Sequence, residues 1–204
     1  MKKIIAIDAD RTLVNSYESD LMSFQEAIEN ALNIKLSEDE IVRLTTWPTK
    51  DFIDSLNLTD EEVEKVKKEW EKTYVKYKTE CFKEMIKLVK ELFNRGYNIN
   101  IITSRNNEEF HELDKALEDI IDLINIVVTS DLVDSPKPSI DSMNYLCDKL
   151  KCTSNDVIYI GDSQVDKDFA INSKCTFIPA CWENKLLIND KNACHNPMDI
   201  LKLL

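Results

Sequence analysis

The sequence predicts an α/β fold in which a parallel sheet carries helices on both faces and a small α-helical cap is inserted into the chain. Three observations lead to this prediction. Residues 4–7 form an uninterrupted apolar run, which is typical of a central strand buried on both faces. Residues 16–80 show helical patterns with almost no strand signal. From residue 81 onward helix and strand patterns alternate, which indicates a parallel sheet.

The first predicted strand ends abruptly on two carboxylates, Asp8 and Asp10. In an open α/β sheet, ligands bind just beyond the carboxyl ends of the strands. Two acids at that place indicate a metal site, a nucleophile with an acid/base partner, or both. The alternative is a solvated loop after a strand, where aspartate is common.

The inserted segment is predicted to form a cap over the carboxyl edge of the sheet. Apolar residues recur at three- and four-residue steps over residues 21–31, which predicts a helix that starts near residue 19 or 20. Residues 37–40 and 59–62 match capping boxes, and the second opens a long charged helix toward Tyr77. Residues 45–50 are expected to be a loop, with a further short helix after it.

The remaining part of the chain is predicted to alternate between helices and strands. Gly96 ends the first of these helices, because a positive φ is needed there. The expected elements are a helix over residues 82–93, a strand over 97–102, a helix over 107–119, a strand over 124–128, a helix from Ser139 to 150, a strand over 157–160, a helix through 169–170 and a strand over 175–178.

Polar side chains gather where the predicted strands end. They are Asp8 and Asp10, then Thr103, Ser104 and Arg105, then Lys137 between two prolines, and finally Asp162 and Asp166. Carboxylates from two strand ends suit Mg²⁺, a hard cation that takes oxygen ligands. A hydroxyl group and a lysine nearby can hold phosphate oxygens. Together these groups are suited to phosphoryl transfer, which depends on positioning and charge neutralisation.

Length and composition fit a globular protein with one substantial core and a modest insertion. The chain has 204 residues, of which 43% are hydrophobic and 31% are charged. The net charge of −12 argues against nucleic acid as the main partner, because phosphate backbones are bound by clustered Lys and Arg. Small anionic substrates remain possible, because a bound cation and a few bases can reverse the sign of the potential within a cleft.

The six cysteines are expected to be free thiols in a reducing compartment. They form no CxxC pair and no zinc-like spacing with the two histidines, and five of them lie in the last third of the chain. The first residues lack the apolar segment of a signal peptide, and no apolar stretch is long enough to cross a bilayer. We therefore expect a cytoplasmic protein without a membrane partner.

Four motifs together resemble those of the haloacid dehalogenase-like (HAD-like) hydrolases. The segment 8–13 reads Asp-Ala-Asp-Arg-Thr-Leu, similar to the first motif of that family, usually Asp-x-Asp-Gly-Thr-Leu. The other motifs follow in order: an apolar strand ending in Thr103, Lys137 in a Lys-Pro pair, and the Gly-Asp-Ser-Gln-Val-Asp of residues 161–166. Residues 166–182 also resemble phosphoglycolate-phosphatase-like members.

This resemblance covers nearly the whole chain and implies both a fold and a domain division. It implies a Rossmann-like α/β core domain of residues 1–15 and 81–204, and a helical cap domain of residues 16–80. It also implies a role for each motif residue. Asp8 would be the nucleophile, Asp10 the general acid and base, Asp8, the Asp10 carbonyl, Asp162 and Asp166 the Mg²⁺ ligands, and Thr103, Ser104 and Lys137 the phosphate-binding groups.

Alternative roles remain open for several of these residues. Asp162 also suits a plain helix N-cap, Asp166 a first-turn acid and Lys137 a solvated loop lysine. The candidates for substrate selection are Arg11, Thr46, Trp47, Lys50 and Arg105. Among these, Trp47 equally suits the core of the cap, and Arg105 equally suits the surface.

Arg11 departs from the family pattern, because a bulky cation replaces the usual glycine. A left-handed backbone would cost arginine about 1–2 kcal/mol, so we expect a negative φ at this residue.

The resulting prediction is a Mg²⁺-dependent phosphatase that hydrolyses a small phosphate monoester through an aspartyl-phosphate. Its partner would be a small phosphorylated metabolite, such as phosphoglycolate, a sugar phosphate or a nucleotide. A phosphomutase of the same fold is one alternative. A catalytically silent phosphate-binding or regulatory protein is another, which is suggested by Arg11 in place of the usual glycine.

Overall fold

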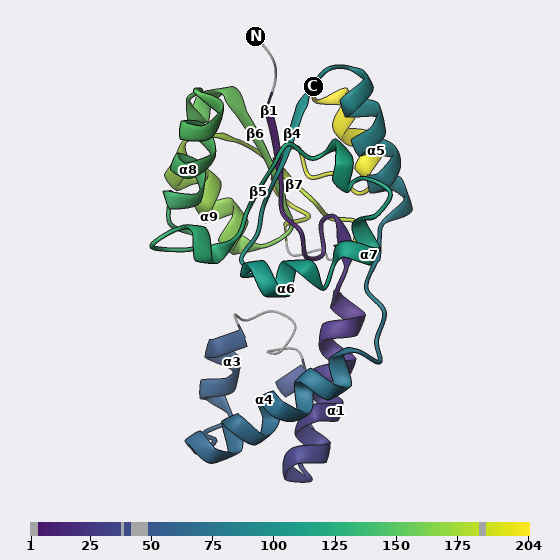
Figure 1. Ribbon diagram of the computed structural model, residues 1–204, viewed down its shortest axis with the longest axis vertical. Coiled ribbons are helices and arrows are strands. Elements are labelled where there is room, and N and C mark those ends of the chain that lie inside the picture. The colour runs from purple at the N-terminus through teal and green to yellow at the C-terminus, as the bar shows by residue number, and fades with distance from the viewer. Residues whose placement is uncertain (1–3, 38, 42–48, 184–186) are drawn as a thin grey trace. The chain divides into compact units, whose positions relative to one another are not determined.

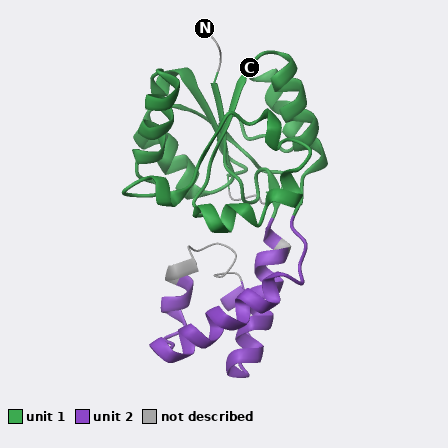
Figure 2. Cartoon of the chain, viewed as in Figure 1, with its two compact units in different colours: residues 1–15, 80–204 green, residues 16–79 purple. Residues whose placement is uncertain are grey.

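The computed structural model describes residues 4–37, 39–41, 49–183 and 187–204. The chain divides into two compact units (Figure 2). Residues 1–15 and 80–204 form the first, here named the sheet unit, and residues 16–79 form the second, here named the helical unit.

Within the described residues, the sheet unit contains a five-stranded parallel sheet in the order β5-β4-β1-β6-β7 (Figure 1). The strands are β1 (Ile4–Ile7), β4 (Asn98–Ile102), β5 (Ile126–Val128), β6 (Val157–Gly161) and β7 (Thr176–Pro179). Every residue of β1 is buried, and this strand pairs with β4 and β6 on either side. The predicted parallel sheet with a buried central strand is confirmed.

Helices cover both faces of this sheet, as predicted. Figure 1 shows α8 and α9 on one face and α5 on the other. Because successive strand residues point to opposite faces, Ile5 and Ile7 pack in the apolar cluster of α5, and Ile4 and Ala6 pack in that of α8 and α9. The helices are α5 (Lys83–Asn94), α6 (Asn107–His111), α7 (Asp114–Leu117), α8 (Asp141–Leu150) and α9 (Gln164–Ser173), with short 3-10 turns η1 (Ile121–Leu123), η2 (Ser130–Leu132), η3 (Ser154–Asp156) and η4 (Pro197–Lys202).

The predicted boundaries in this unit are wrong at α6 and α8, and β5 begins at Ile126 rather than at residue 124. The single helix expected over residues 107–119 is two short helices, because the Leu113 N–H turns back to the Phe110 carbonyl and closes α6 early. The N-cap of α8 is Ile140 rather than Ser139, whose own N–H is engaged in a turn with the Pro136 carbonyl.

A two-stranded antiparallel ribbon lies where the chain leaves and re-enters the sheet unit. It pairs β2 (Val14–Asn15) with β3 (Glu80–Cys81). The sequence pattern does not predict this ribbon, because each strand has only two residues. It fixes both ends of the inserted segment next to each other.

The helical unit contains α1 (Tyr17–Leu32), α3 (Thr49–Ser55) and α4 (Asp60–Tyr74), with a further helical turn at residues 39–41. Both predicted capping boxes are present, since Ser37 and Glu40 exchange hydrogen bonds, as do Thr59 and Glu62. The α4 helix ends at Tyr74, before the expected Tyr77. The apolar core of this unit is formed by Phe24, Ile28, Leu36, Phe52 and Val66.

All six cysteines are free thiols, as predicted. Within the described part of the chain, no helix combines the length and the apolar character needed to cross a bilayer.

Candidate active site

The candidate site lies at the carboxyl edge of the sheet, where three neighbouring strands end. Asp8 follows β1, and its N–H donates to the Ile160 carbonyl at 2.9 Å, which keeps the chain in register beyond the strand. Thr103 follows β4, and its N–H donates to the Val128 carbonyl at 3.0 Å. Asp162 follows β6 directly. Because parallel strands end on the same edge, three distant segments of the chain deliver polar side chains to one place.

Three buried aspartates form the centre of the site. Asp8, Asp162 and Asp166 each place one carboxylate oxygen within 4.8 Å of the others. The Asp10 side chain lies outside this cluster, and the family resemblance gives that residue a metal-ligand role only through its backbone carbonyl.

Gly161 and Ser163 explain how Asp166 reaches this cluster from the first turn of α9. A Cβ atom on Gly161 would lie 2.5 Å from the Asp166 Cγ atom, so only glycine leaves room for the carboxyl group. Ser163 is the N-cap of α9, and its N–H and Oγ donate to Asp166 Oδ2 at 3.1 and 2.6 Å. Asp166 is therefore both a capping-box acid and a member of the carboxylate cluster.

Lys137 joins the members of this cluster. Its Nζ donates to Asp8 Oδ1 at 2.6 Å, to Asp166 Oδ1 at 2.7 Å and to the Tyr159 hydroxyl oxygen at 2.9 Å. The Tyr159 hydroxyl in turn donates to Asp166 Oδ1 at 2.8 Å. The lysine side chain is almost completely buried, so the reading of Lys137 as a solvated loop residue is wrong.

Sequence reasoning missed Tyr159. The signal was present, because a tyrosine in an otherwise apolar, buried strand must find a partner for its hydroxyl group. Because Tyr159 lies two residues before Gly161, the last residue of β6, a partner for its hydroxyl group is expected near the end of this strand.

The charges in this cluster do not balance. Burial raises the pKa of Asp8 well above its usual value, against the opposing effect of Lys137, and burial together with Asp166 raises the pKa of Asp162 to about 7. Burial alone would also raise the pKa of Asp166, but the Lys137 ammonium holds it below its usual value. Three carboxylates and one ammonium leave two negative charges when all are ionised. This excess and the hard oxygen donors fit a divalent cation.

Asp10 has different surroundings. The Arg105 guanidinium forms a bidentate ion pair with the Asp10 carboxylate. Its Nε donates to Oδ2 at 2.9 Å, and its Nη2 donates to Oδ1 at 2.7 Å. Arg105 was expected to be a substrate contact or a surface base, and the structure places it against the second aspartate of the first motif.

Thr103 is buried and Ser104 is exposed at the end of β4. The Thr103 Oγ1 atom accepts a hydrogen bond from the Arg105 N–H at 3.1 Å. Its hydroxyl hydrogen can still be donated to a ligand.

The expected negative φ at Arg11 is wrong. Arg11 has φ +59°, the left-handed conformation that glycine adopts most readily. The turn closes tightly around this residue, because the N–H groups of both Leu13 and Val14 donate to the Ala9 carbonyl, at 2.9 and 3.0 Å. The usual glycine of this motif therefore suits a position that needs a positive φ, and Arg11 adopts that conformation in its place.

Three of the proposed substrate residues belong to the helical unit. Thr46 and Trp47 lie outside the described residues. Lys50 belongs to α3, but its side chain is not among the described groups.

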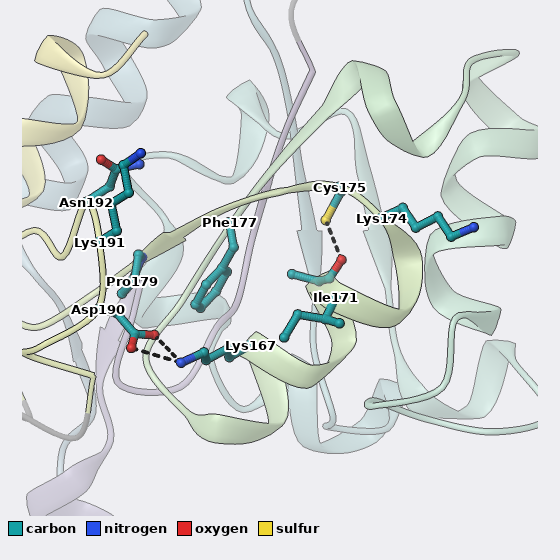
Figure 3. A pocket seen from close by; sticks show the side chains of 10 residues that line it. Lys167, Ile171, Lys174, Cys175, Phe177, Pro179, Asp190, Lys191 and Asn192 are labelled. Carbon is teal, nitrogen blue, oxygen red and sulfur yellow. Dashed lines mark hydrogen bonds and ion pairs between the residues drawn. The ribbon is translucent and has the colours of Figure 1, made fainter.

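A pocket of about 570 Å³ lies beside β7 and α9, and none of its lining residues belongs to the predicted site (Figure 3). Phe177 and Ile171 supply apolar walls. Lys167, which also lines it, is engaged with Asp190 at 2.8 Å.

Carboxylates gathered at the carboxyl edge of a parallel sheet, with a buried lysine between them, define an α/β enzyme suited to phosphoester hydrolysis. The chain belongs to the haloacid dehalogenase-like hydrolases, since the sequence model of that family matches residues 5–180. The resemblance seen in the motifs is thereby confirmed. Within this family the protein is a phosphatase-like hydrolase.

Comparison with individual proteins agrees with this family. The chain is 24% identical over 169 residues to the "Putative pyrophosphatase PpaX" of Clostridium perfringens, covering 81% of this chain and 78% of that protein. A predicted phosphoglycolate phosphatase from Haemophilus somnus has a similar structure, with a TM-score of 0.80, 19% identity and coverage of 99% and 97%. A haloacid dehalogenase-like family hydrolase from Streptococcus pneumoniae gives a TM-score of 0.83 at 19% identity, with coverage of 99% and 98%. At these identities, the structural likeness shows the fold alone.

Proposed function

We propose that the protein is a Mg²⁺-dependent phosphatase that hydrolyses a small phosphate monoester through an aspartyl-phosphate on Asp8. The observation that carries this proposal is the position of the Lys137 ammonium between Asp8 and Asp166 within a buried carboxylate cluster. A carboxylate can approach a phosphate dianion only where cations offset their repulsion, and here one cation is already in contact with the nucleophile.

Asp8, Asp162 and Asp166 would hold the metal ion, together with the backbone carbonyl of Asp10. Mg²⁺ suits this set because it prefers oxygen ligands and leaves positions for water and substrate phosphate. When bound, it would neutralise charge on the phosphoryl oxygens.

The residues of the chain then divide the reaction between them. A carboxylate oxygen of Asp8 attacks phosphorus as the bond to the leaving oxygen breaks, and Asp10 donates a proton to that oxygen. A water molecule next attacks phosphorus and gives a proton to Asp10. The bond between Asp8 and phosphorus breaks in this step, so that inorganic phosphate is released and the Asp8 carboxylate is restored. Lys137, the Thr103 hydroxyl and Ser104 bind the phosphoryl oxygens.

We further propose that residues 1–15 and 81–204 act as the catalytic domain and residues 16–80 as the cap that selects the substrate, with Thr46, Trp47 and Lys50 as contacts. The names of the relatives make phosphoglycolate and pyrophosphate the first compounds to test. A cytoplasmic location is also proposed, because six free thiols suit a reducing compartment.

The test is a panel of phosphorylated metabolites, with p-nitrophenyl phosphate as a general substrate, assayed for phosphate release with Mg²⁺ and after its removal. Mg²⁺-dependent release supports the proposal. A long-lived phosphoenzyme that transfers its group to a second hydroxyl would instead identify a phosphomutase. Absence of turnover with every compound would favour a silent phosphate-binding protein.

A further inference from the structure

We propose that Arg105 is a positioning residue that holds the Asp10 carboxyl group in the orientation needed for proton transfer. This inference rests on the proposed function, because it assigns to Asp10 the proton transfers of phosphatase turnover. It adds a residue from a different strand end, whose side chain would act on the substrate only through Asp10.

The contact between the two side chains is extensive. Arg105 Nε lies 3.1 Å from Asp10 Oδ1 and 2.9 Å from Oδ2, and Nη2 lies 2.7 Å from Oδ1. A planar guanidinium that meets a carboxylate in this way fixes both the place and the rotation of the carboxyl group. A lysine ammonium at the same place would fix the distance but not the rotation.

Arg105 is itself held by its neighbours. Its N–H donates to Thr103 Oγ1 at 3.1 Å, its carbonyl accepts from the Ser130 N–H at 2.9 Å, and its Nη1 donates to the Glu109 carbonyl at 3.3 Å. Glu109 is in turn fixed by the capping box with Asn106 that opens α6. The guanidinium is therefore a rigid support, anchored through backbone and side chain.

The exposure of the two partners indicates which of them meets a ligand. The Arg105 side chain is 11% exposed, whereas that of Asp10 is 29% exposed. The carboxyl group is thus the accessible member, with the guanidinium behind it. Glu112 approaches the other end of the guanidinium, with Oε2 at 3.6 Å from Nη1, so that end is also occupied.

Orientation matters for both proton transfers. In the first, the proton leaves Asp10 for the oxygen whose bond to phosphorus breaks while the Asp8–phosphorus bond forms. In the second, the proton returns to Asp10 from the water whose oxygen binds phosphorus while the Asp8–phosphorus bond breaks. A displacement of about 1 Å in a catalytic group can cost about 10²-fold in rate.

The experiment compares kcat/KM for a short alkyl phosphate and for p-nitrophenyl phosphate in Arg105→Gln, Arg105→Lys, Asp10→Asn and the double variant Asp10→Asn/Arg105→Gln. In the proposed mechanism kcat/KM reports substrate binding and the formation of the phosphoenzyme. In that step only the alkyl ester needs a proton on its leaving oxygen. The matched control is Arg95→Gln, which breaks an exposed pair with Glu91 in the same unit.

Arg105→Gln is expected to lower kcat/KM for the alkyl phosphate about 10–100-fold and for p-nitrophenyl phosphate far less. Arg105→Lys should recover part of the loss, and Arg105→Gln should add nothing to Asp10→Asn. Arg95→Gln should leave both values unchanged.

Four results would overturn the inference. An equal loss with both esters, or a loss that adds to that of Asp10→Asn, would make Arg105 a direct substrate contact. Unchanged kinetics would make the pair a surface ion pair without a catalytic role. If the wild-type protein releases phosphate from neither ester and from no compound of the metabolite panel, the proposed function fails and this inference fails with it, whereas wild-type turnover with additive variants defeats the inference alone.

Discussion

Asp8 and Asp10 are separated by one residue, yet their carboxyl groups differ in burial and in the cation that each of them contacts. Asp8 is buried against Lys137 in a cluster with two other carboxylates. Asp10 is partly exposed and is held by Arg105 outside that cluster. The first region concentrates charge away from water, and the second presents a carboxyl group at the surface of the site.

This difference shows how one short loop can serve two chemical purposes. A nucleophile that must meet a phosphate dianion needs cations in contact with it, and these interactions are strongest where water is excluded. A proton-transfer group must instead reach the leaving oxygen and a water molecule. The turn that closes on the Ala9 carbonyl begins between the two aspartates and contains Asp10 and Arg11, so the surroundings change within a few residues.

The largest expected effect comes from Asp8→Asn, which removes the nucleophile with almost no change in size. Turnover should fall at least about 10⁴-fold, because an amide does not form the acyl phosphate. The melting temperature should not fall, since a buried charge is removed. Phosphate release and thermal unfolding measure both, with Asp122→Asn on the exposed surface as the control. A variant that keeps a few per cent of the wild-type rate would show that Asp8 is not the nucleophile.

Lys137→Gln should damage both activity and stability, because two buried carboxylates lose their shared cation. Removing one partner of a buried ion pair costs about 3–5 kcal/mol. In the absence of divalent ions we expect the free energy of unfolding to fall by about 3 kcal/mol. Turnover should fall about 10²-fold or more.

The matched control for this variant is Lys167→Gln. Its partner is Asp190 and both side chains are partly exposed, so the cost should be about 1 kcal/mol or less. Urea unfolding of both variants provides the comparison. Equal losses would show that the buried position of Lys137 has no special effect.

Asp162→Asn should weaken metal binding without destabilising the fold. It removes one of three mutually repelling carboxylates, so the metal-free variant should be more stable than wild type by about 1 kcal/mol at mildly alkaline pH. Mg²⁺ should raise the melting temperature of the wild type and much less that of the variant. An equal rise in both proteins would exclude Asp162 as a ligand.

The smallest effect is expected from Arg11→Gly, which relieves the left-handed backbone of a bulky residue. The variant should gain up to about 1 kcal/mol in the free energy of unfolding, reduced by the greater freedom of glycine in the unfolded chain. Arg95, at φ −80°, is the control, because glycine there should destabilise the protein. A loss of stability in Arg11→Gly would mean that the arginine side chain contributes more than its backbone costs.

Local patterns predicted much of the architecture. The apolar run of β1, the capping boxes at Ser37 and Thr59, and the glycine that ends α5 each depend on a few consecutive residues. The meeting of the strand ends was also predictable, because a parallel sheet brings them to one edge. The family motifs then selected candidate residues at that edge.

The remaining features depend on contacts between distant residues. The pair of Asp10 and Arg105 joins positions 95 residues apart, and nothing in either segment specifies its partner. The hydrogen bond from Lys137 to Tyr159 requires the loop that carries Lys137 to pack against β6. The positive φ of Arg11 goes against the intrinsic preference of arginine, because the hydrogen bonds that close the turn override that preference.

The proposed mechanism depends most on a covalent phosphoryl group at Asp8 rather than at Asp10. Borohydride reduction of enzyme quenched during turnover converts a phosphorylated aspartate to homoserine, which peptide sequencing by mass spectrometry locates. The proposed mechanism predicts homoserine at position 8 alone, and none when substrate is omitted. Homoserine at position 10, or none at all in an enzyme that turns over, would contradict it.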